Sequence, residues 1–218
     1  MRKKQRRFEE NAGRRNVIQP GKPFYDTVKG NWHNDFFCND NPIVVEMGCG
    51  RGEYTVGLAQ HFTSINFIGI DIKGDRIWKG SSMADQLGLE NAAFLRTQVQ
   101  QVENFFEENE VDEIWITFPD PRPKDRDEKR RLTFKRFIEI YKRIMKSGGI
   151  IHLKTDNTEL FEYSLETILQ RKDVEELEFT RDLYTSPLNE LHLGIQTRYE
   201  KKHHDLGEKI KYLRFKLI

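Results

Sequence analysis

Residues 43–62 read IVVEMGCGRGEYTVGLAQHF and join a short apolar run, a glycine-rich turn and a segment with helical spacing. The apolar run ends at the first of three closely spaced glycines, Gly48, Gly50 and Gly52. Glycines at this spacing allow the backbone to turn tightly and to approach a ligand without a Cβ in the way. The stretch therefore predicts a buried strand, a tight turn and then a helix.

The same alternation continues along the chain. Further strands are expected at residues 66–72, 92–99, 111–118 and 148–156, and helices at residues 54–62, 75–89, 102–109, 133–146 and 158–171. This alternation implies βαβ units and a mostly parallel sheet with helices on both faces. Residues 176–184 and 209–217 are strand-like with only a loop and a short helical stretch between them, which favours an antiparallel strand near one edge. The predicted fold is α/β, a doubly wound, Rossmann-like domain with a mostly parallel seven-stranded sheet.

Composition and charge bear on the domain organisation. The chain has 218 residues, of which 37% are apolar and 33% charged, enough for one domain with a heavily charged surface. The net charge of +1 argues against a uniformly basic nucleic-acid binder, but Lys and Arg gather in residues 1–15 and 122–136. Such segregation suits a local site for a polyanion. We expect a basic, partly ordered N-terminal arm at residues 1–41 and a single domain at residues 42–218.

The sequence shows no signal for export, membrane insertion or metal binding. Its two cysteines, Cys38 and Cys49, and the lack of a secretory apolar segment predict a reducing, cytoplasmic setting. No apolar run approaches the roughly 20 residues that span a bilayer. The six histidines show no ligand spacing, so no metal site is expected.

The glycine turn carries acidic residues that bear on the kind of ligand it binds. Its pattern is E-x-G-x-G-x-G from Glu46 to Gly52, whereas a dinucleotide fingerprint is G-x-G-x-x-G. Carboxylates at Glu46 and Glu53 would repel a pyrophosphate and suit a cationic ligand. Asp71 ends the next strand, where a carboxylate can hold a ribose diol by two hydrogen bonds. The alternative interpretation is that the glycines serve packing alone, as in many strand-to-helix loops.

This combination resembles the S-adenosylmethionine site of class I methyltransferases. The resemblance implies that Glu46 lies near the sulfonium and amino-acid part, that Gly48 and Gly50 line the cofactor, and that Asp71 binds its ribose. The third strand of such domains usually supplies an acid near the adenine. Gln98 stands there in this chain, and an amide can still donate and accept hydrogen bonds.

Three further motifs lie later in the chain. The fourth strand runs into FPDPRPKDRDEKRRL, residues 118–132, in which two prolines hold Asp120 on a stiff turn before a basic tract. KTDN at residues 154–157 follows the fifth strand, and TRYE lies at residues 197–200. These motifs resemble those of the tRNA (guanine-N7)-methyltransferase family, and the resemblance runs from about Val44 to the C-terminus. It implies methyl transfer from S-adenosylmethionine to N7 of the variable-loop guanine at position 46 of tRNA.

The family resemblance also implies roles for matching positions. Asp120 matches the catalytic acid, which also borders the cofactor. Substrate binding is implied for Lys124, Asp156, Thr197, Arg198, Tyr199 and Glu200, and RNA contact for Arg126, Lys129, Arg130 and Arg131. The chain departs from the family at Arg122-Pro123, where Trp-His or a similar pair is usual, and at Asp127, where histidine is common.

Less specific interpretations stay open for each motif. A tract of mixed charge is most often a solvated surface, Asp120 suits a turn, and Asp156 suits the cap of the helix after it. Rival functions are N-methylation of another nucleic acid or a small amine, RNA binding without catalysis, and a nicotinamide-dependent dehydrogenase, which the glycine spacing disfavours. The expected partner is tRNA, bound by a monomer or homodimer, and no obligatory partner subunit is evident.

Overall fold

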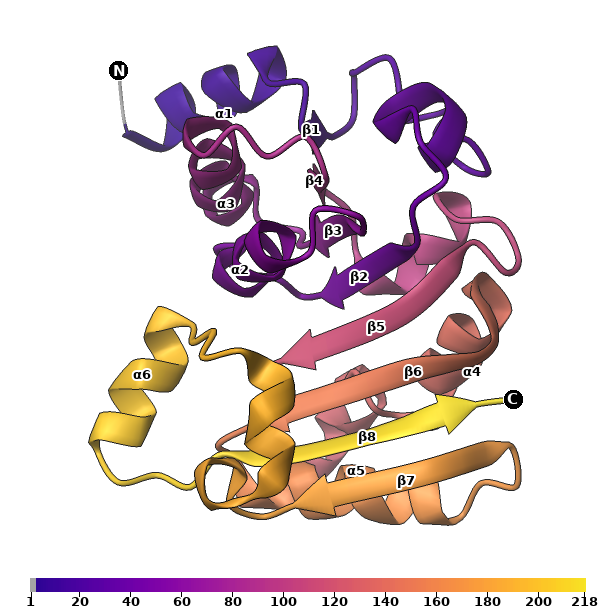
Figure 1. Cartoon of the computed structure of the whole chain (residues 1–218), viewed down its shortest axis with the longest axis vertical. Coiled ribbons are helices and arrows are strands. Elements are labelled where there is room, and N and C mark those ends of the chain that lie inside the picture. The colour runs from indigo at the N-terminus through magenta and orange to yellow at the C-terminus, as the bar shows by residue number, and fades with distance from the viewer. Residues whose placement is uncertain (1–2) are drawn as a thin grey trace.

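The computed structural model describes residues 3–218, so Met1 and Arg2 of the predicted arm lie outside the described residues. These residues form one eight-stranded sheet in the order β1-β4-β3-β2-β5-β6-β8-β7 (Figure 1). The strands are β1 (Val17–Ile18), β2 (Ile43–Met47), β3 (Asn66–Ile70), β4 (Ala92–Leu95), β5 (Val111–Thr117), β6 (Met145–Thr155), β7 (Val174–Thr180) and β8 (Lys211–Leu217). Neighbouring strands are parallel, except that β8 runs antiparallel to β6 and β7.

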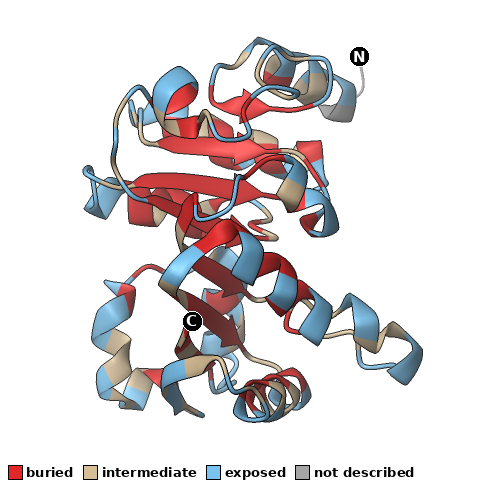
Figure 2. Cartoon of the chain, turned by 90° about the vertical axis from the view of Figure 1, so that its right-hand side faces the viewer, coloured by how far each residue is buried: buried red, intermediate tan, exposed pale blue. Residues whose placement is uncertain are grey.

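Helices cover both faces of the sheet. The α-helices are α1 (Lys3–Gly13), α2 (Glu53–His61), α3 (Gly74–Gln86), α4 (Lys135–Ile144), α5 (Thr158–Leu169) and α6 (Arg198–Asp205). Shorter turns of π- or 3₁₀-helix lie at Trp32–Phe37, Val99–Asn104, Asp125–Arg130, Leu183–Thr185 and Pro187–His192. Most strands are buried between helices whose outer faces are exposed, whereas the edge strand β7 has no buried residue (Figure 2). None of the described helices is both long and apolar enough to cross a bilayer.

Alternation along the strands divides the core into two apolar layers. Val45 of β2 packs in the layer that contains Phe137 of α4 and Phe161 of α5. Its neighbour Val44 belongs to the opposite layer, with Leu58 of α2. Successive side chains of a strand point to opposite faces, so a continuous apolar strand can support helices on both sides.

The predicted fold class is confirmed, and all seven predicted strands are present. The strand number needs a correction, because Val17 and Ile18 pair with Phe94 and Leu95 and add β1 beyond β4. The helix predicted at residues 102–109 is wrong, since a 3₁₀-helix ends at Asn104 and a loop follows. Two consecutive rings, at positions 105 and 106, are both buried there, which one amphipathic helical face does not favour.

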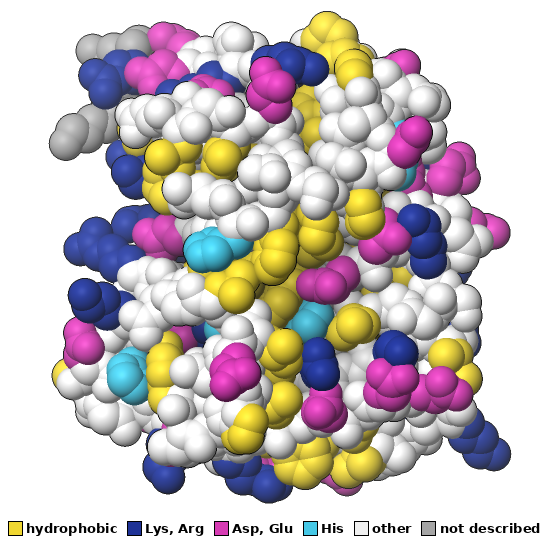
Figure 3. Space-filling view, in the orientation of Figure 1, with side chains coloured by type: hydrophobic (Ala, Val, Ile, Leu, Met, Phe, Trp, Pro, Cys, Tyr) yellow, Lys and Arg dark blue, Asp and Glu magenta, His cyan; other side chains and the backbone are white. Residues whose placement is uncertain are grey.

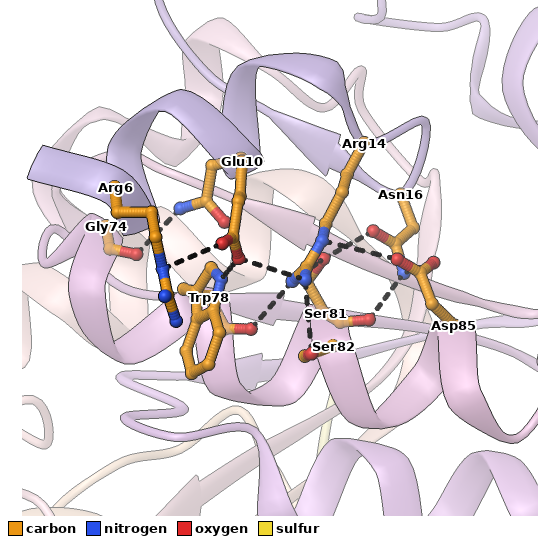
Figure 4. A network of polar contacts seen from close by, with 10 residues as sticks. Arg6, Glu10, Arg14, Asn16, Gly74, Trp78, Ser81, Ser82 and Asp85 are labelled. Atoms are coloured by element: carbon orange, nitrogen blue, oxygen red, sulfur yellow. Dashed lines mark hydrogen bonds and ion pairs between the residues drawn. The ribbon is translucent and has the colours of Figure 1, made fainter. Parts of the chain in front are cut away.

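The N-terminal segment is attached to α3 by polar contacts (Figure 4). The Asn11 side chain donates to the carbonyl oxygen of Gly74 over 2.7 Å, and Asn11 is fully buried. Arg14 lies 3.4 Å from the carboxylate of Asp85, and the Asn16 amide donates to the same carboxylate over 2.8 Å. These contacts join residues more than 60 positions apart and hold α1 and β1 against the rest of the sheet.

The carboxyl ends of the parallel strands all lie on the same side of the sheet, on the left in Figure 1, and α6 lies beside these ends. The strand order reverses between β2 and β5, because β3 and β4 lie on one side of β2 while β5 and β6 lie on the other. In open α/β sheets a ligand binds at the carboxyl ends of the strands beside such a reversal. The fold therefore predicts a ligand site at the carboxyl ends of β2 and β5.

Candidate functional site

A cavity of about 610 Å³ lies at the carboxyl ends of β2 and β5. The loop after β2, the end of β5 and the start of α6 form its walls. It is lined by Gly48, Cys49, Gly50, Arg51, Glu53, Arg76, Thr117, Phe118, Thr197, Arg198, Tyr199 and Lys202. The cavity thus lies where the strand order predicts a ligand.

The glycine loop depends on backbone conformations that other residues rarely adopt. Gly48, Gly50 and Gly52 have φ angles of 78°, 56° and 68°. A Cβ on Gly52 would also lie 2.4 Å from the ring of Phe94, which is too close. A Cβ on Gly50 would meet nothing nearer than 4.0 Å, so this backbone faces open space in the cavity. The loop can therefore bring its peptide groups close to a ligand.

Glu46 lies behind this loop and is almost fully buried. One carboxylate oxygen accepts hydrogen bonds from the backbone N–H and the hydroxyl of Thr55, and the other accepts one from the Thr117 hydroxyl. Burial raises the pKa of Glu46 to about 7, although these hydrogen bonds oppose the shift. A cationic ligand nearby would favour the ionised carboxylate.

Asp71 follows β3 and fixes the far side of the loop. Its carboxylate accepts hydrogen bonds from the backbone N–H of Gly50 over 3.1 Å and of Lys73 over 2.7 Å. Burial raises the pKa of Asp71, while these bonds and the nearby Arg76 guanidinium favour the charged form. A carboxylate has about four acceptor positions, so Asp71 keeps capacity for the hydroxyls of a ribose.

The loop after β5 carries two non-glycine residues with positive φ, Phe118 at 47° and Arg122 at 49°. Asp120 lies between them and is exposed. Its carboxylate accepts a hydrogen bond from the backbone N–H of Arg122 over 3.2 Å and lies 3.2 Å from the guanidinium of the same residue. Arg122, which departs from the family pattern, therefore pairs with the predicted catalytic acid.

The predicted C-terminal motif begins α6. Thr197 caps the helix by accepting from the backbone N–H of Glu200, and Glu200 reaches back to the backbone N–H of Thr197. The backbone N–H of Arg198 donates to the carboxylate of Glu53 over 2.7 Å. Since Glu53 starts α2 directly after the glycine loop, this bond joins the loop to α6.

A fully buried ion pair joins α6 to β6. The ammonium group of Lys154 lies 2.7 Å from Glu200 Oε1, and the side chains are 1% and 0% exposed. The Tyr184 hydroxyl donates to the same oxygen over 2.7 Å. Burial lowers the pKa of Lys154, and the neighbouring carboxylate opposes that shift. Glu200 is thus shielded from solvent and holds the helix that carries Thr197.

Tyr199 forms an aromatic wall with Phe118, whose ring centroid is 5.4 Å away. The Tyr199 hydroxyl donates to Asp156 over 3.1 Å, and His203 Nδ1 lies 3.4 Å from the same carboxylate. The alternative in which Asp156 caps the following helix is wrong, because Asn157 accepts the hydrogen bond at the start of α5. Asp156 instead fixes the orientation of Tyr199.

Side chains in the basic tract differ in how freely they project. Arg130 pairs with Asp127 at 3.0 Å. The Arg131 guanidinium stacks over the ring of Tyr163 at 4.3 Å and donates twice to the carbonyl oxygen of Arg122. The exposed basic side chains of the tract are Lys124, Arg126, Lys129 and Arg130. Arg131 therefore braces the loop that carries Asp120.

The structure brings part of the predicted site together. The predicted residues that line the cavity are Gly48, Gly50, Thr197, Arg198 and Tyr199. Those behind its walls are Glu46, Asp71, Asp156 and Glu200, as their contacts with Thr117, the glycine loop and α6 show. Those outside its lining, on loops near it or on the exposed tract, are Asp120, Lys124, Arg126, Lys129, Arg130 and Arg131, and Gln98 is exposed after β4.

Sequence reasoning missed five lining residues, Cys49, Arg51, Arg76, Thr117 and Lys202. Two of them carry a signal in retrospect. Arg51 lies inside the glycine pattern itself, and Lys202 follows Arg198 by four residues, which places both on one face of a helix.

Comparisons with known proteins agree with this geometry. The sequence matches the profile of a family described as "Putative methyltransferase" over residues 40–213. A relative from Cytophaga hutchinsonii, named tRNA (guanine-N(7)-)-methyltransferase, is 50% identical over 218 residues, which cover 100% of this chain and 98% of the relative. A relative of the same name from Christiangramia forsetii is 48% identical over 98% of this chain and 97% of the relative.

Solved structures with the same fold are also methyltransferases. The 16S rRNA methyltransferase KamB has a TM-score of 0.61 at 12% identity, over 84% of this chain and 91% of that chain. A SAM-dependent O-methyltransferase from Thermotoga maritima has a TM-score of 0.57 at 14% identity, over 89% of this chain and 62% of that chain. At such identities the likeness concerns the fold alone. Fold, cavity and full-length relatives together show that this chain belongs to the tRNA (guanine-N7)-methyltransferase family, whose methyl donor is S-adenosylmethionine.

Proposed function

We propose that this protein transfers a methyl group from S-adenosylmethionine to N7 of a guanine in tRNA, at position 46 of the variable loop. The observation that carries the proposal is the similarity over the whole chain to relatives named tRNA (guanine-N(7)-)-methyltransferase. The cavity at the ends of β2 and β5 supports it, because it joins a cofactor loop to an aromatic wall. We expect the reaction to take place in the cytoplasm, where tRNA is found.

The residues around the glycine loop fit the cofactor. When bound, S-adenosylmethionine supplies a methyl group on a positively charged sulfur. Glu46 offers a buried carboxylate near that charge, Gly48 and Gly50 offer an open backbone, and Asp71 offers acceptors for the ribose hydroxyls. Gln98 stays a proposed contact to the adenine, since it follows β4 at the same edge of the sheet.

Asp71→Ala is expected to weaken cofactor binding by about tenfold or more, because hydrogen bonds to a charged group contribute about 1.5–3 kcal/mol each. Calorimetric titration with S-adenosylhomocysteine measures the effect. Asp71→Asn keeps one oxygen for the backbone N–H groups of the loop and should bind more tightly than the alanine variant. Equal affinity of Asp71→Ala and the unaltered protein would contradict the ribose role.

The acceptor atom needs little activation. Guanine N7 has an in-plane lone pair that is free at neutral pH, so no general base is required. The positive charge moves onto the purine as the methyl group transfers. The protein can contribute an in-line arrangement and a fixed carboxylate near the growing charge. We assign the second task to Asp120, which follows β5 on a loop held by Arg131.

The aromatic wall and two carboxylates suit recognition of the base. A guanine taken out of its stack can lie against Phe118 and Tyr199, as single bases do on aromatic side chains. Asp120 and Asp156 can accept hydrogen bonds from the guanine N1–H and N2–H₂ groups, which adenine does not present. Glu200 acts through α6, because it is buried and positions Thr197.

The exposed basic tract suits contact with the RNA backbone. Lys124, Arg126 and Lys129 project from the turn beyond Asp120, and each can approach a phosphate. Arg130 and Arg131 are already engaged with Asp127 and Tyr163, so we assign them a share in shaping this surface as well as in RNA contact.

Two tRNA transcripts that differ only at position 46 test the proposed target. We expect the protein to transfer labelled methyl groups from S-adenosylmethionine to the transcript with guanine there, and to leave the transcript with adenine unlabelled. Equal labelling of both transcripts would place the target elsewhere. Labelling of small amines or DNA in preference to tRNA would favour the rival N-methyltransferase.

A further inference from the structure

Basic side chains from three separate segments converge on the cavity. Arg51 comes from the glycine loop, Arg76 from α3, and Arg198 and Lys202 from α6. Glu53 is the only acidic residue of the lining, so four cations face one carboxylate. That carboxylate already accepts the backbone N–H of Arg198. In the space-filling view, Lys and Arg side chains gather at the left edge of the molecule, where the parallel strands end (Figure 3).

Three of these cations have no partner for their charge among the described residues. Among the side chains that the structure describes, none forms a hydrogen bond or ion pair with the side chain of Arg51, Arg198 or Lys202, and all three residues are exposed. Arg198 and Lys202 lie four positions apart in α6, which places them on one face of the helix. Like charges held this close repel one another, and a bound anion would relieve that repulsion.

The fourth cation, Arg76, differs from these three because it lies near a carboxylate. Arg76 lies close enough to Asp71 for its charge to favour the ionised form of that carboxylate. Its charge is therefore already partly balanced at the cofactor end of the cavity. In the basic tract beyond β5, Arg130 pairs with Asp127 and Arg131 stacks on Tyr163. The other exposed cations of that tract do not line the cavity. Within the cavity lining, the unbalanced positive charge therefore belongs to Arg51, Arg198 and Lys202.

We propose that Arg51, Arg198 and Lys202 together bind a phosphate group of the nucleotide whose base enters the cavity. This inference rests on the proposed function and adds the place at which the RNA backbone is held during the reaction. A base that leaves its stack brings its own phosphates to the mouth of the pocket that receives it. Cations at that mouth would both hold the RNA and fix the distance of the base from the methyl donor.

The carboxylate of the bound cofactor is a second anion that these cations could attract. The phosphate is favoured because α6 supplies two of the three cations, and the same helix carries Tyr199 of the aromatic wall. The two alternatives predict different effects. A phosphate site affects the affinity for RNA and its salt dependence, whereas a carboxylate site affects the affinity for S-adenosylhomocysteine in the absence of RNA.

The test compares two double variants of the full chain. Arg51→Gln/Lys202→Gln removes two rim cations, and Lys79→Gln/Lys201→Gln removes two exposed cations of α3 and α6 that do not line the cavity. The dissociation constant of an unmodified tRNA transcript is measured over a range of KCl concentrations. The slope of log Kd against log salt should fall by about one unit for the rim variant, since the loss of one phosphate contact removes about one.

The control variant should keep a slope close to that of the unaltered protein, and S-adenosylhomocysteine should bind all three proteins equally. An equal slope for the rim variant and the control would overturn the proposal. Weaker binding of S-adenosylhomocysteine to the rim variant, with unchanged salt dependence for tRNA, would overturn it in favour of the carboxylate. The proposed function has its own test and fails if the unaltered protein transfers no methyl group to tRNA. The two outcomes can be told apart because the slopes are measured by binding alone.

Discussion

Lys154→Met is expected to lower the free energy of unfolding by about 3–5 kcal/mol. The substitution leaves the carboxylate of Glu200 buried without its charge partner, and that carboxylate is 0% exposed. The Tyr184 hydroxyl alone would then remain to satisfy the oxygen that faced the ammonium group. For a domain of this size the loss corresponds to a fall in Tm of roughly 10 °C or more. Urea and thermal unfolding followed by circular dichroism measure it.

Two variants serve as controls for this prediction. Lys216→Met breaks an exposed pair with Glu176 that has a similar distance of 2.6 Å, and such surface pairs stabilise proteins little. Lys154→Met/Glu200→Leu removes both buried charges and should recover much of the stability that the single substitution loses. If Lys154→Met unfolded at the same urea concentration as the unaltered protein, the ion pair could not be what holds α6.

Asp120→Asn is expected to lower kcat for methyl transfer to tRNA by about 100- to 1,000-fold, the usual effect of removing one group that stabilises developing charge. The amide has nearly the same shape but carries no negative charge toward the purine. Asp120 is exposed, so the fold and the affinities for tRNA and S-adenosylhomocysteine should change little. Single-turnover measurements with saturating tRNA and cofactor separate the chemical step from binding.

Asp125→Asn provides the matched control, because Asp125 is an exposed acid five residues further along the same segment and does not line the cavity. Its kcat should stay within about threefold of that of the unaltered protein. A kcat for Asp120→Asn within the same range would show that Asp120 only forms the turn between its two prolines.

Local patterns accounted for the fold and for the glycine-loop side of the cavity. The glycine loop could be predicted because Gly48, Gly50 and Gly52 adopt backbone angles that few other residues tolerate. Asp71 could be predicted because the end of a strand places a carboxylate at a known edge of the sheet. In both cases a few adjacent residues determine the local structure.

Pairing between distant segments could not be predicted. Nothing in the sequence joins Lys154 to Glu200 across 46 positions, so the buried role of Glu200 appears only when β6 and α6 meet. The same holds for α1. Its sequence is polar and charged, yet the side chain of Asn11 is buried and donates a hydrogen bond to Gly74. The place of Arg51 in the cavity lining could not be predicted either, because the glycine pattern around it determines the backbone conformation and not the direction of a side chain.

The chemical identity of the methylated nucleoside tests the proposed function most directly. Unmodified tRNA is incubated with the protein and S-adenosylmethionine, digested to nucleosides and separated by liquid chromatography with mass spectrometry. We predict that 7-methylguanosine appears, and that it is absent when Asp120→Asn replaces the unaltered protein over the same time. Methyl groups found on another nucleoside, or no methylated nucleoside at all, would contradict the proposal.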